Sequence, residues 1–407
     1  MKQFSKFVMV VKLLVVLSLF LVACGDEAST GNNTNAEEDN GGDSATAENG
    51  VVKIGVLAPL TGPVAQFGNS VNNGLMLYVE EFNARGNLQI EIISFDEEGD
   101  PALGLTGYHS LYDQGVSAII GSVTSGVTMA IVPEAYMDSM PMISASATHL
   151  GVTYDSETGQ VFTNMFRTAY IDPYQGYKLA NFAYHELGAT TAGVLFNTGD
   201  DYSTGLTNAF VEQAEALGLE MVATEGFAAG AVEFQSQLTN IAAANPDVLF
   251  VPVYYEDVAL IAGQAASAGV ESTLIGGDGW DSVLNIIADP SLLEGAFYAS
   301  GYSNDYPSER VQEFLAAYRE KHGEDPNMFA AQAYDAAMVL FAAILEVEEH
   351  GLERATLEYR EAVIDALAAT DMETVTGRIT FDEYNNPQKP LLILEIEDGV
   401  ATFWGSY

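Results

Sequence analysis

The stretch "VVKIGVLAPLTGPVAQFG", residues 51–68, joins an apolar run to a loop rich in Gly and Pro. The run at 51–58 has the length and the β-branched content of a buried strand. An amphipathic segment follows at 68–84, which is typical of a helix packed on a sheet. This strand and helix therefore predict the first βα unit of a parallel sheet.

The same alternation of short apolar runs and longer amphipathic segments continues along the chain. A first series predicts strands at 88–96, 117–121 and 141–145 and helices at 101–114 and 125–139. A second series predicts strands at 191–196, 219–227, 247–255 and 272–280 and helices at 203–217, 232–244 and 256–268. The last part predicts helices at 307–322, 328–349 and 355–369 and strands at 377–382, 390–397 and 400–405. Two α/β units in tandem are therefore expected.

The N-terminus has the features of a signal peptide, predicted at 1–23. Lysines precede an apolar run at 13–23, which is shorter than the ~20 residues of a membrane-spanning helix. The run ends in "LVACG", where Cys24 is the only cysteine of the chain. This pattern resembles a bacterial lipobox, which implies cleavage before Cys24 and a diacylglycerol anchor in the membrane. The alternative is a buried or incidental cysteine.

Charge and composition restrict the partners. Residues 25–50 contain no large apolar side chain, so 24–50 is expected to be a disordered acidic tether, and its acidic clusters match no calcium-loop spacing. The whole chain has 14 Lys plus Arg against 57 Asp plus Glu, a formal net charge of −43. Such a charge repels nucleic acid, so no nucleic-acid partner is expected.

An enzyme is an alternative, because tandem parallel α/β units also occur in dehydrogenases and hydrolases. The glycines at 55, 62 and 68 do not have the G-x-G-x-x-G spacing of a dinucleotide site. "GNSVN" at 68–72 lacks the G-x-S-x-G pattern, and the five histidines lie in separate segments. His149 follows a strand and could contact a ligand, although an exposed loop histidine is the simpler interpretation. No catalytic set, cofactor or metal is therefore expected.

Hydroxyl side chains follow two neighbouring strands, where ligands of parallel sheets bind. Ser125 lies where a helix should begin, so its hydroxyl and the following amides would present donors to a carboxylate. Alternatively, Ser125 or Thr124 simply caps that helix. Ser146 and Thr148 follow the next strand and can complete the hydrogen bonds of the carboxylate.

In "LIGGDGW", residues 274–280, the carboxylate of Asp278 lies among glycines. Glycines on both sides should leave the backbone uncrowded, so that Asp278 can pair with an ammonium group in a cleft. The alternative is an ordinary Gly-rich turn. Aromatic side chains at other strand ends and loops can wall an apolar pocket: Phe67, Tyr202, Tyr254, Tyr255 and Trp280. Together these residues predict a pocket for an α-amino acid.

The sequence resembles the type I periplasmic binding proteins, specifically the leucine/isoleucine/valine-binding proteins of ABC importers. The resemblance covers nearly all of 51–407 and rests on "KIGVLAPLTGPVAQFG", "EEGDPALG", "SGVT", "ISASAT", "DDYSTGL" and "GRITFDEYNN". It implies two Rossmann-like α/β lobes with parallel sheets, which close on the ligand about three hinge crossovers. The crossovers would fall near 167–171, 299–303 and 374–378. One lobe would comprise 51–168 with 302–375, and the other 169–301 with 376–407.

The resemblance also implies a role for each pocket residue. Ser125, Ser146 through its backbone, and Thr148 would hold the ligand carboxylate. Asp278 and Tyr254 would hold the ammonium group. The positions expected around the ligand side chain are Phe67, Tyr202 and Phe329, with Trp280 close by and narrowing the pocket.

Two positions depart from the family's pattern. Well-studied members pair a cysteine in the "EEGDP" loop with one in the "SVTSG" loop, and the matching residues here are Gly99 and Thr124. A glutamate is common where this chain has Asp278, which shortens the reach of the carboxylate by one methylene.

The expected function is a monomeric, lipid-anchored receptor without enzymatic activity outside the cytoplasm. It would capture an amino acid, branched-chain or similar, and deliver it to an ABC permease. The alternative is a sensor of the same fold for amides or short organic acids. Permease and ATPase genes beside this gene would favour transport, whereas a kinase gene would favour sensing.

Overall fold

The computed structural model describes residues 50–86 and 88–407. The predicted signal peptide, the predicted lipidation site at Cys24 and the predicted tether up to residue 49 lie outside the described residues. Within the described part, the chain forms a five-stranded and a seven-stranded sheet, each covered by helices, and two small two-stranded sheets.

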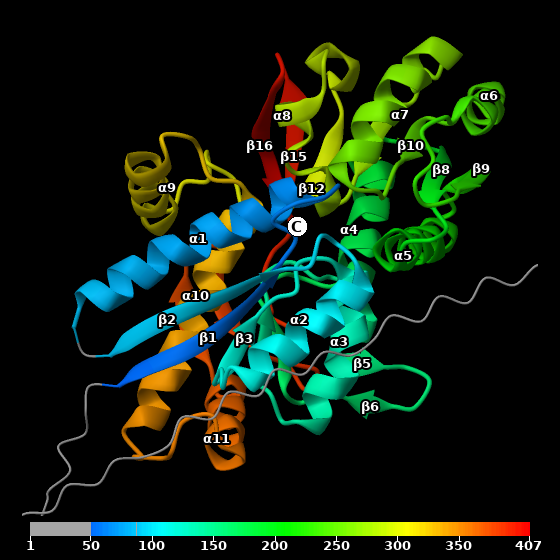
Figure 1. The fold of residues 1–407 in the computed structure, drawn as a ribbon. Helices are drawn as coiled ribbons and strands as arrows, with labels where there is room; N and C mark the ends of the chain where they lie inside the picture. Colours follow the sequence, from blue (N-terminus) through cyan, green and yellow to red (C-terminus); the bar gives the residue numbers. More distant parts are fainter. Residues whose placement is uncertain (1–49, 87) are drawn as a thin grey trace, which may run out of the picture. The chain divides into compact units, whose positions relative to one another are not determined.

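The first sheet is wholly parallel, with the strand order β2-β1-β3-β4-β7. Its strands are β1 (Val51–Ala58), β2 (Gln89–Asp96), β3 (Ala118–Ile120), β4 (Met142–Ser144) and β7 (Met165–Arg167). Helix α1 (Ala65–Ala84) packs on one face, and α2 (Pro101–Asp113) and α3 (Ser125–Met137) pack on the other (Figure 1). Side chains on one face of β1 pack against α1, and those on the other face pack against α2 and α3. Both faces of the strand are therefore buried.

The second sheet has the order β16-β15-β12-β11-β10-β8-β9. Its strands are β8 (Thr191–Asn197), β9 (Glu220–Phe227), β10 (Val248–Phe250), β11 (Thr273–Gly276), β12 (Phe297–Ser300), β15 (Leu392–Glu397) and β16 (Val400–Ser406). Strands β8 to β12 are parallel, and β15 and β16 add an antiparallel edge. Helices α4 (Asp172–His185) and α5 (Asp201–Leu217) pack on one face, and α6 (Gln235–Ala244) and α7 (Tyr255–Ala268) pack on the other.

The chain passes between the two sheets after β7, after β12 and before β15. After β12 come α9 (Glu309–His322), α10 (Met328–Glu348), α11 (Leu357–Ala368) and the hairpin of β13 (Asp371–Thr374) and β14 (Gly377–Thr380). The shorter elements are η1 (Leu150–Val152), β5 (Tyr154–Asp155), β6 (Gln160–Val161), η2 (Asp278–Trp280), α8 (Val283–Ile286) and η3 (Pro290–Leu293). We refer to β1–β7 with α1–α3 and α9–α11 as the first-sheet side, and to β8–β12, β15 and β16 with α4–α8 as the second-sheet side.

Helix α10 lies along α1 and is central to the first-sheet side (Figure 1). The two helices approach so closely that a Cβ on Gly74 would lie 2.0 Å from the carbonyl oxygen of Ala330. Length and composition alone would let α10 cross a membrane, but most of it is buried inside the fold. It is therefore a core helix.

The predicted fold class, α/β with two parallel-sheet units, is confirmed. Helix α4 is an addition that the sequence pattern does not predict. Strand β10 ends at Phe250, whereas the prediction extends it to Tyr255. The reason is Pro252, which has no N–H to continue the ladder, so the chain leaves the sheet and Tyr254 becomes the N-cap of α7.

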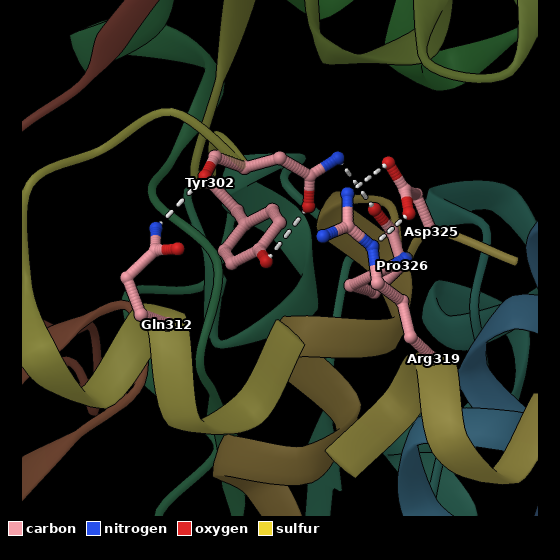
Figure 2. Close-up of polar contacts among 6 residues, drawn as sticks. Tyr302, Gln312, Arg319, Asp325 and Pro326 are labelled. Atoms are coloured by element: carbon pink, nitrogen blue, oxygen red, sulfur yellow. Dashed lines mark hydrogen bonds and ion pairs between the residues drawn. The ribbon is translucent and has the colours of Figure 1, made fainter. Parts of the chain in front are cut away.

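The segment after β12 is fixed by hydrogen bonds of Asn304, whose partners Tyr302, Gln312 and Pro326 are labelled in Figure 2. Its side-chain oxygen accepts a hydrogen bond from Tyr302 Oη at 2.9 Å, and its side-chain nitrogen donates to the carbonyl of Pro326 at 3.3 Å. Gln312 Nε2 in α9 donates to the backbone carbonyl of Asn304 at 2.9 Å. These bonds hold the second passage against the helices that follow it.

A buried charge network holds the first and third passages together. Lys389 Nζ donates to the carbonyl of Thr168 at 2.8 Å and to Thr376 Oγ1 at 2.7 Å. Asp335, on α10, accepts from the amides of Val375 and Thr376 at 2.8 and 3.0 Å. Burial lowers the pKa of Lys389 to about 8 and raises the pKa of Asp335 above its ordinary value. The passages are thus anchored by groups that are costly to separate.

Hydrogen bonds to Glu97 join the loops that follow β2 and β3, which contain Gly99 and Ser122. Its carboxylate accepts from Ser122 Oγ at 2.7 Å and from the amide of Gly99 at 2.6 Å. Ser144 Oγ in turn donates to the carbonyl of Ser122 at 2.6 Å. Glu97 is fully buried, and burial raises its pKa. The loops after β2 and β3 are therefore tied through a carboxylate.

We expect Glu97→Ala to lower the free energy of unfolding by about 1–3 kcal/mol, because buried donors on Ser122 and Gly99 lose their acceptor. The measurement is urea unfolding at neutral pH. The matched control is Glu91→Ala on β2, where the side chain is exposed and the change should stay within about 0.5 kcal/mol. Equal effects of the two substitutions would contradict a tethering role for Glu97.

Candidate ligand-binding site

A small cavity lies where loops from both sheets meet. About 10 Å³ of space is lined by Phe67, Val123, Thr124, Ser125, Ser146, Thr148 and Phe329 from the first-sheet side and by Tyr202, Tyr254, Asp278 and Gly279 from the second-sheet side. All predicted pocket residues except Trp280 and Tyr255 are thus brought together. This volume is far below the roughly 300–1,000 Å³ of ligand pockets, so the lining side chains lie close together and must move apart to admit a guest.

Ser125 is the first residue of α3 and presents a helix amino terminus to the cavity. The side chain of the N-cap residue, Thr124, makes no capping hydrogen bond, and Ser125 Oγ accepts from the amide of His149 at 3.2 Å. The alternative in which either hydroxyl merely caps the helix is therefore wrong. Amides in a first helical turn have no acceptor within the helix, and the helix dipole adds partial positive charge there.

Ser146 and Thr148 continue this donor-rich end. Ser146 Oγ donates to the carbonyl of Val123 at 2.7 Å, so its hydroxyl is already engaged, whereas its amide makes only a long 3.3 Å bond to Ser144 Oγ. Thr148 is buried, and its carbonyl accepts from the amide of Asp172 at 3.0 Å. The end of the cavity formed by α3 and this loop therefore offers hydroxyl and amide groups to an anion.

Asp278 lies across the cavity from these groups, at the start of η2 after β11. It is 3% exposed, and its Oδ1 accepts from Gln175 Nε2 at 3.0 Å while its amide donates to Gln175 Oε1 at 2.7 Å. Burial raises the pKa of Asp278 to about 6. Across residues 50–86 and 88–407, no Lys, Arg or His forms an ion pair with this carboxylate.

The glycines around Asp278 are required for close packing. A Cβ on Gly276 would lie 2.1 Å from Trp280 Cε2, and a Cβ on Gly277 would lie 2.5 Å from Tyr202 Oη. At Gly279 a Cβ would lie 2.9 Å from the carbonyl oxygen of Val253. The prediction that glycine leaves this backbone uncrowded is therefore wrong: neighbouring side chains and backbone occupy the space that side chains here would need.

Trp280 does not line the cavity, in contrast to its predicted position. The ring is fully buried, and its Nε1 donates to the carbonyl of Val251 at 2.7 Å. It packs beneath Gly276 and stacks near Tyr298 at 6.4 Å between ring centroids. Trp280 therefore supports the turn of Asp278 from the core.

Aromatic rings form the remaining walls. Phe67 and Phe329 stack at 4.0 Å between centroids with an interplanar angle of 16°. Tyr202 and Tyr254 stack at 5.0 Å and 9°, and Tyr254 meets Phe67 edge-on at 5.6 Å. These rings give the cavity an apolar wall between its two polar ends.

Gln175 and Asp172, both on α4, belong to this region and are missed by the sequence prediction. Asp172 is 1% exposed, and burial together with the charge of Asp278 raises its pKa well above the ordinary value. Gln175 orients Asp278 directly. Pro173 early in α4 is a helix-start signal that could have revealed both residues.

His149 does not line the cavity. It lies on a separate, more open groove beside α4 and α5, is partly buried, and its Nδ1 accepts from the amide of Gly151 at 3.0 Å. Within residues 50–86 and 88–407, no group of three or more His, Cys, Asp or Glu side chains is placed to hold a metal ion.

Comparison with known proteins agrees with this geometry. The sequence profile of the periplasmic binding proteins matches residues 51–401. The chain is 26% identical over 337 residues to the leucine-, isoleucine-, valine-, threonine-, and alanine-binding protein of Pseudomonas aeruginosa, a match that covers 82% of this chain and 86% of that protein.

Two solved structures are similar over nearly their whole length. The leucine-binding protein LivK of Thermotoga maritima has a TM-score of 0.80 and 29% identity, covering 87% of this chain and 98% of that one. The branched-chain amino acid transporter substrate-binding protein LivJ of Streptococcus pneumoniae, solved with isoleucine, has a TM-score of 0.79 and 30% identity, covering 88% and 99%.

The profile spans almost all described residues, and both structures share the arrangement of two covered sheets. The chain therefore belongs to the periplasmic binding proteins, solute-binding proteins that act outside the cytoplasm, and is a type I member similar to the leucine/isoleucine/valine-binding proteins of ABC importers.

Proposed function

We propose that this protein captures a zwitterionic amino acid in the cavity and delivers it to an ABC permease. The observation that supports the proposal most is Asp278, a buried carboxylate without a cationic partner among the described residues, facing the amino terminus of α3 across a small space. An ammonium group would neutralise this carboxylate, and hydroxyls and amides at the other end would receive a carboxylate.

Each polar end has proposed contacts. The ligand carboxylate would bind Ser125 Oγ, Thr148 Oγ1 and the backbone amide of Ser146, because the hydroxyl of Ser146 is occupied by Val123. The ammonium group would bind Asp278 and Tyr254. Exclusion of water from the cavity strengthens both interactions.

The apolar end favours an aliphatic side chain. Phe67, Phe329, Tyr202 and Tyr254 present ring surface, which packs favourably against an apolar group. The relative from Pseudomonas aeruginosa is a leucine-, isoleucine-, valine-, threonine-, and alanine-binding protein, and the one from Streptococcus pneumoniae is a branched-chain amino acid transporter substrate-binding protein. A branched-chain amino acid is therefore the ligand that we propose first.

Capture would occur by closure of two lobes about the three passages, with 51–168 and 302–386 in one lobe and 169–301 and 387–407 in the other. The last boundary lies later than the predicted residue 375, because Asn385 donates to the carbonyls of Thr163 and Met165 at 3.1 Å. The permease would recognise the closed form, so binding must favour closure. A diacylglycerol on Cys24 would keep the monomeric receptor at the membrane.

A second candidate function is sensing of an amide or a short organic acid. The raised pKa of Asp278, about 6, is the observation that favours it, because a protonated carboxyl can donate a hydrogen bond to a ligand without an ammonium group. The two candidate functions differ in the charge of the ligand group that contacts Asp278: it is positive for an amino acid and absent for an amide or acid.

A ligand screen by isothermal calorimetry separates these candidates. We expect L-leucine, L-isoleucine or L-valine to bind with measurable heat and benzoate and short-chain amides to bind weakly or not at all, because only the amino acids supply a cation for Asp278. Tight binding of an amide or acid, with no response to amino acids, would favour the second candidate.

Removing the carboxylate tests its proposed partner. We expect Asp278→Ala to cost about 2–5 kcal/mol of amino-acid binding, roughly a 30-fold to several-thousand-fold rise in Kd, because the ammonium would be buried unpaired. The measurement is calorimetry with the best amino acid of the screen. Asp371→Ala, which removes an exposed carboxylate paired with Arg378, serves as the control and should leave Kd unchanged. Unchanged affinity in Asp278→Ala would contradict the ammonium site.

The affinity should also depend on pH. Below about pH 6 the carboxyl of Asp278 is protonated in the free protein, and it must lose that proton to pair with an ammonium group. Affinity should therefore fall by up to about tenfold per pH unit below 6 and level off above it. Calorimetry from about pH 5 to about pH 7.5 measures this slope.

The variant Asp278→Asn should lack this slope of affinity against pH. Any slope that remains reports Asp172 and Asp281, whose pKa values burial also raises. Parallel profiles for parent and variant would refute the assignment.

A further inference from the structure

The aromatic wall formed by Phe67 and Phe329 belongs to the first-sheet side. Two sets of hydrogen bonds from the second-sheet side hold the residues next to these two rings. One set comes from Tyr255 on α7, and the other comes from Asp281 and Ser282 after η2. None of these three residues lines the cavity. They therefore do not touch a ligand in it.

Tyr255 holds the loop that leads into α1. Its Oη donates to the carbonyl of Pro63 at 2.8 Å and accepts from the amide of Gln66 at 3.2 Å. The side chain is 2% exposed, and its ring meets Phe67 edge-on at 4.8 Å. The hydroxyl thus fixes the backbone next to the wall residue, from the opposite side of the cavity.

Asp281 and Ser282 hold the start of α10 in the same way. Asp281 Oδ2 accepts from the amide of Met328 at 3.0 Å, and Ser282 Oγ accepts from Asn327 Nδ2 at 2.9 Å. Asn327 Nδ2 also reaches Ser70 Oγ on α1 at 2.9 Å. These bonds end one residue before Phe329, which stacks on Phe67. Both wall residues are therefore adjacent to a bond that crosses between the two sides.

We infer that Tyr255 and the Asp281–Ser282 pair are closing contacts that couple the fit of the ligand side chain to lobe closure; this rests on the proposed function. The bonds span the two sides and so stabilise only the closed arrangement. A side chain that fills the space against Phe67 and Phe329 keeps their loops in position for these bonds. A side chain that is too small leaves the rings unsupported and weakens the same bonds.

The test uses Tyr255→Phe in the full chain with Cys24→Ser. Spin labels go on cysteines introduced at Met137, on the first-sheet side, and Val232, on the second-sheet side, which are 82% and 62% exposed. The label distance reports closure, and stopped-flow binding of L-isoleucine and L-alanine reports rates. The control is Tyr108→Phe, which removes a buried hydroxyl that bonds Asp138 within the first-sheet side at 2.7 Å.

We expect Tyr255→Phe to shift the label distances toward the open form and to weaken L-isoleucine binding about five- to thirtyfold, mainly through faster dissociation. The ratio of L-isoleucine affinity to L-alanine affinity should fall, because without the Tyr255 hydroxyl the fit of the ligand side chain is no longer coupled to lobe closure. Tyr108→Phe should lower thermal stability and leave distances, dissociation rate and that ratio unchanged.

The outcomes separate this inference from the proposed function. If neither amino acid binds, the ligand assignment fails, but the distances of the ligand-free parent and variant still test the closing contacts. Equal distance distributions and dissociation rates in parent and Tyr255→Phe would overturn the inference. A parent that is fully open without ligand, and that no amino acid closes, would overturn it as well.

Discussion

The site depends on one constraint: a carboxylate is kept away from water without a cation of the protein beside it. Ionised Asp278 is costly to bury, and its neighbours reduce that cost only partly, through the Gln175 amide and dipoles of the turn. The close packing of Trp280 and Tyr202 against glycines keeps water out. The buried negative charge of Asp278 therefore remains energetically unfavourable until a positively charged group binds beside it. This gives the cavity its selectivity.

The geometry of parallel sheets explains why the two polar ends come from different parts of the chain. The helix that starts after β3 directs its amino terminus into the cavity from one sheet, and the turn after β11 brings the acid from the other. Neither sheet alone carries both charges. A complete site therefore exists only while the two sides are together, and the buried network of Lys389 and Asp335 holds the first and third connecting passages to each other.

The sequence predicts the regular elements well, because strands buried on both faces and amphipathic helices leave strong patterns. It also predicts most cavity residues, since hydroxyls, aromatics and an isolated acid follow strand ends. The start of α4, with Gln175 and Asp172, is missed although Pro173 is a helix-start signal. Two further features depend on tertiary contacts and are not visible in the pattern. Trp280 looks like a loop residue but finds a carbonyl acceptor in the core. The glycines of the turn are needed because residues distant in sequence, such as Tyr202, occupy the space that a side chain would take.

The hydrogen bonds of Glu97 have a consequence for the conditions under which this protein can mature. Cys24 is the only cysteine of the chain, so no intramolecular disulfide can form, and Ser122 and Gly99 are held by a carboxylate. The fold can therefore be completed in a reducing medium, without thiol oxidoreductases, and thiol reagents have no covalent cross-link to break.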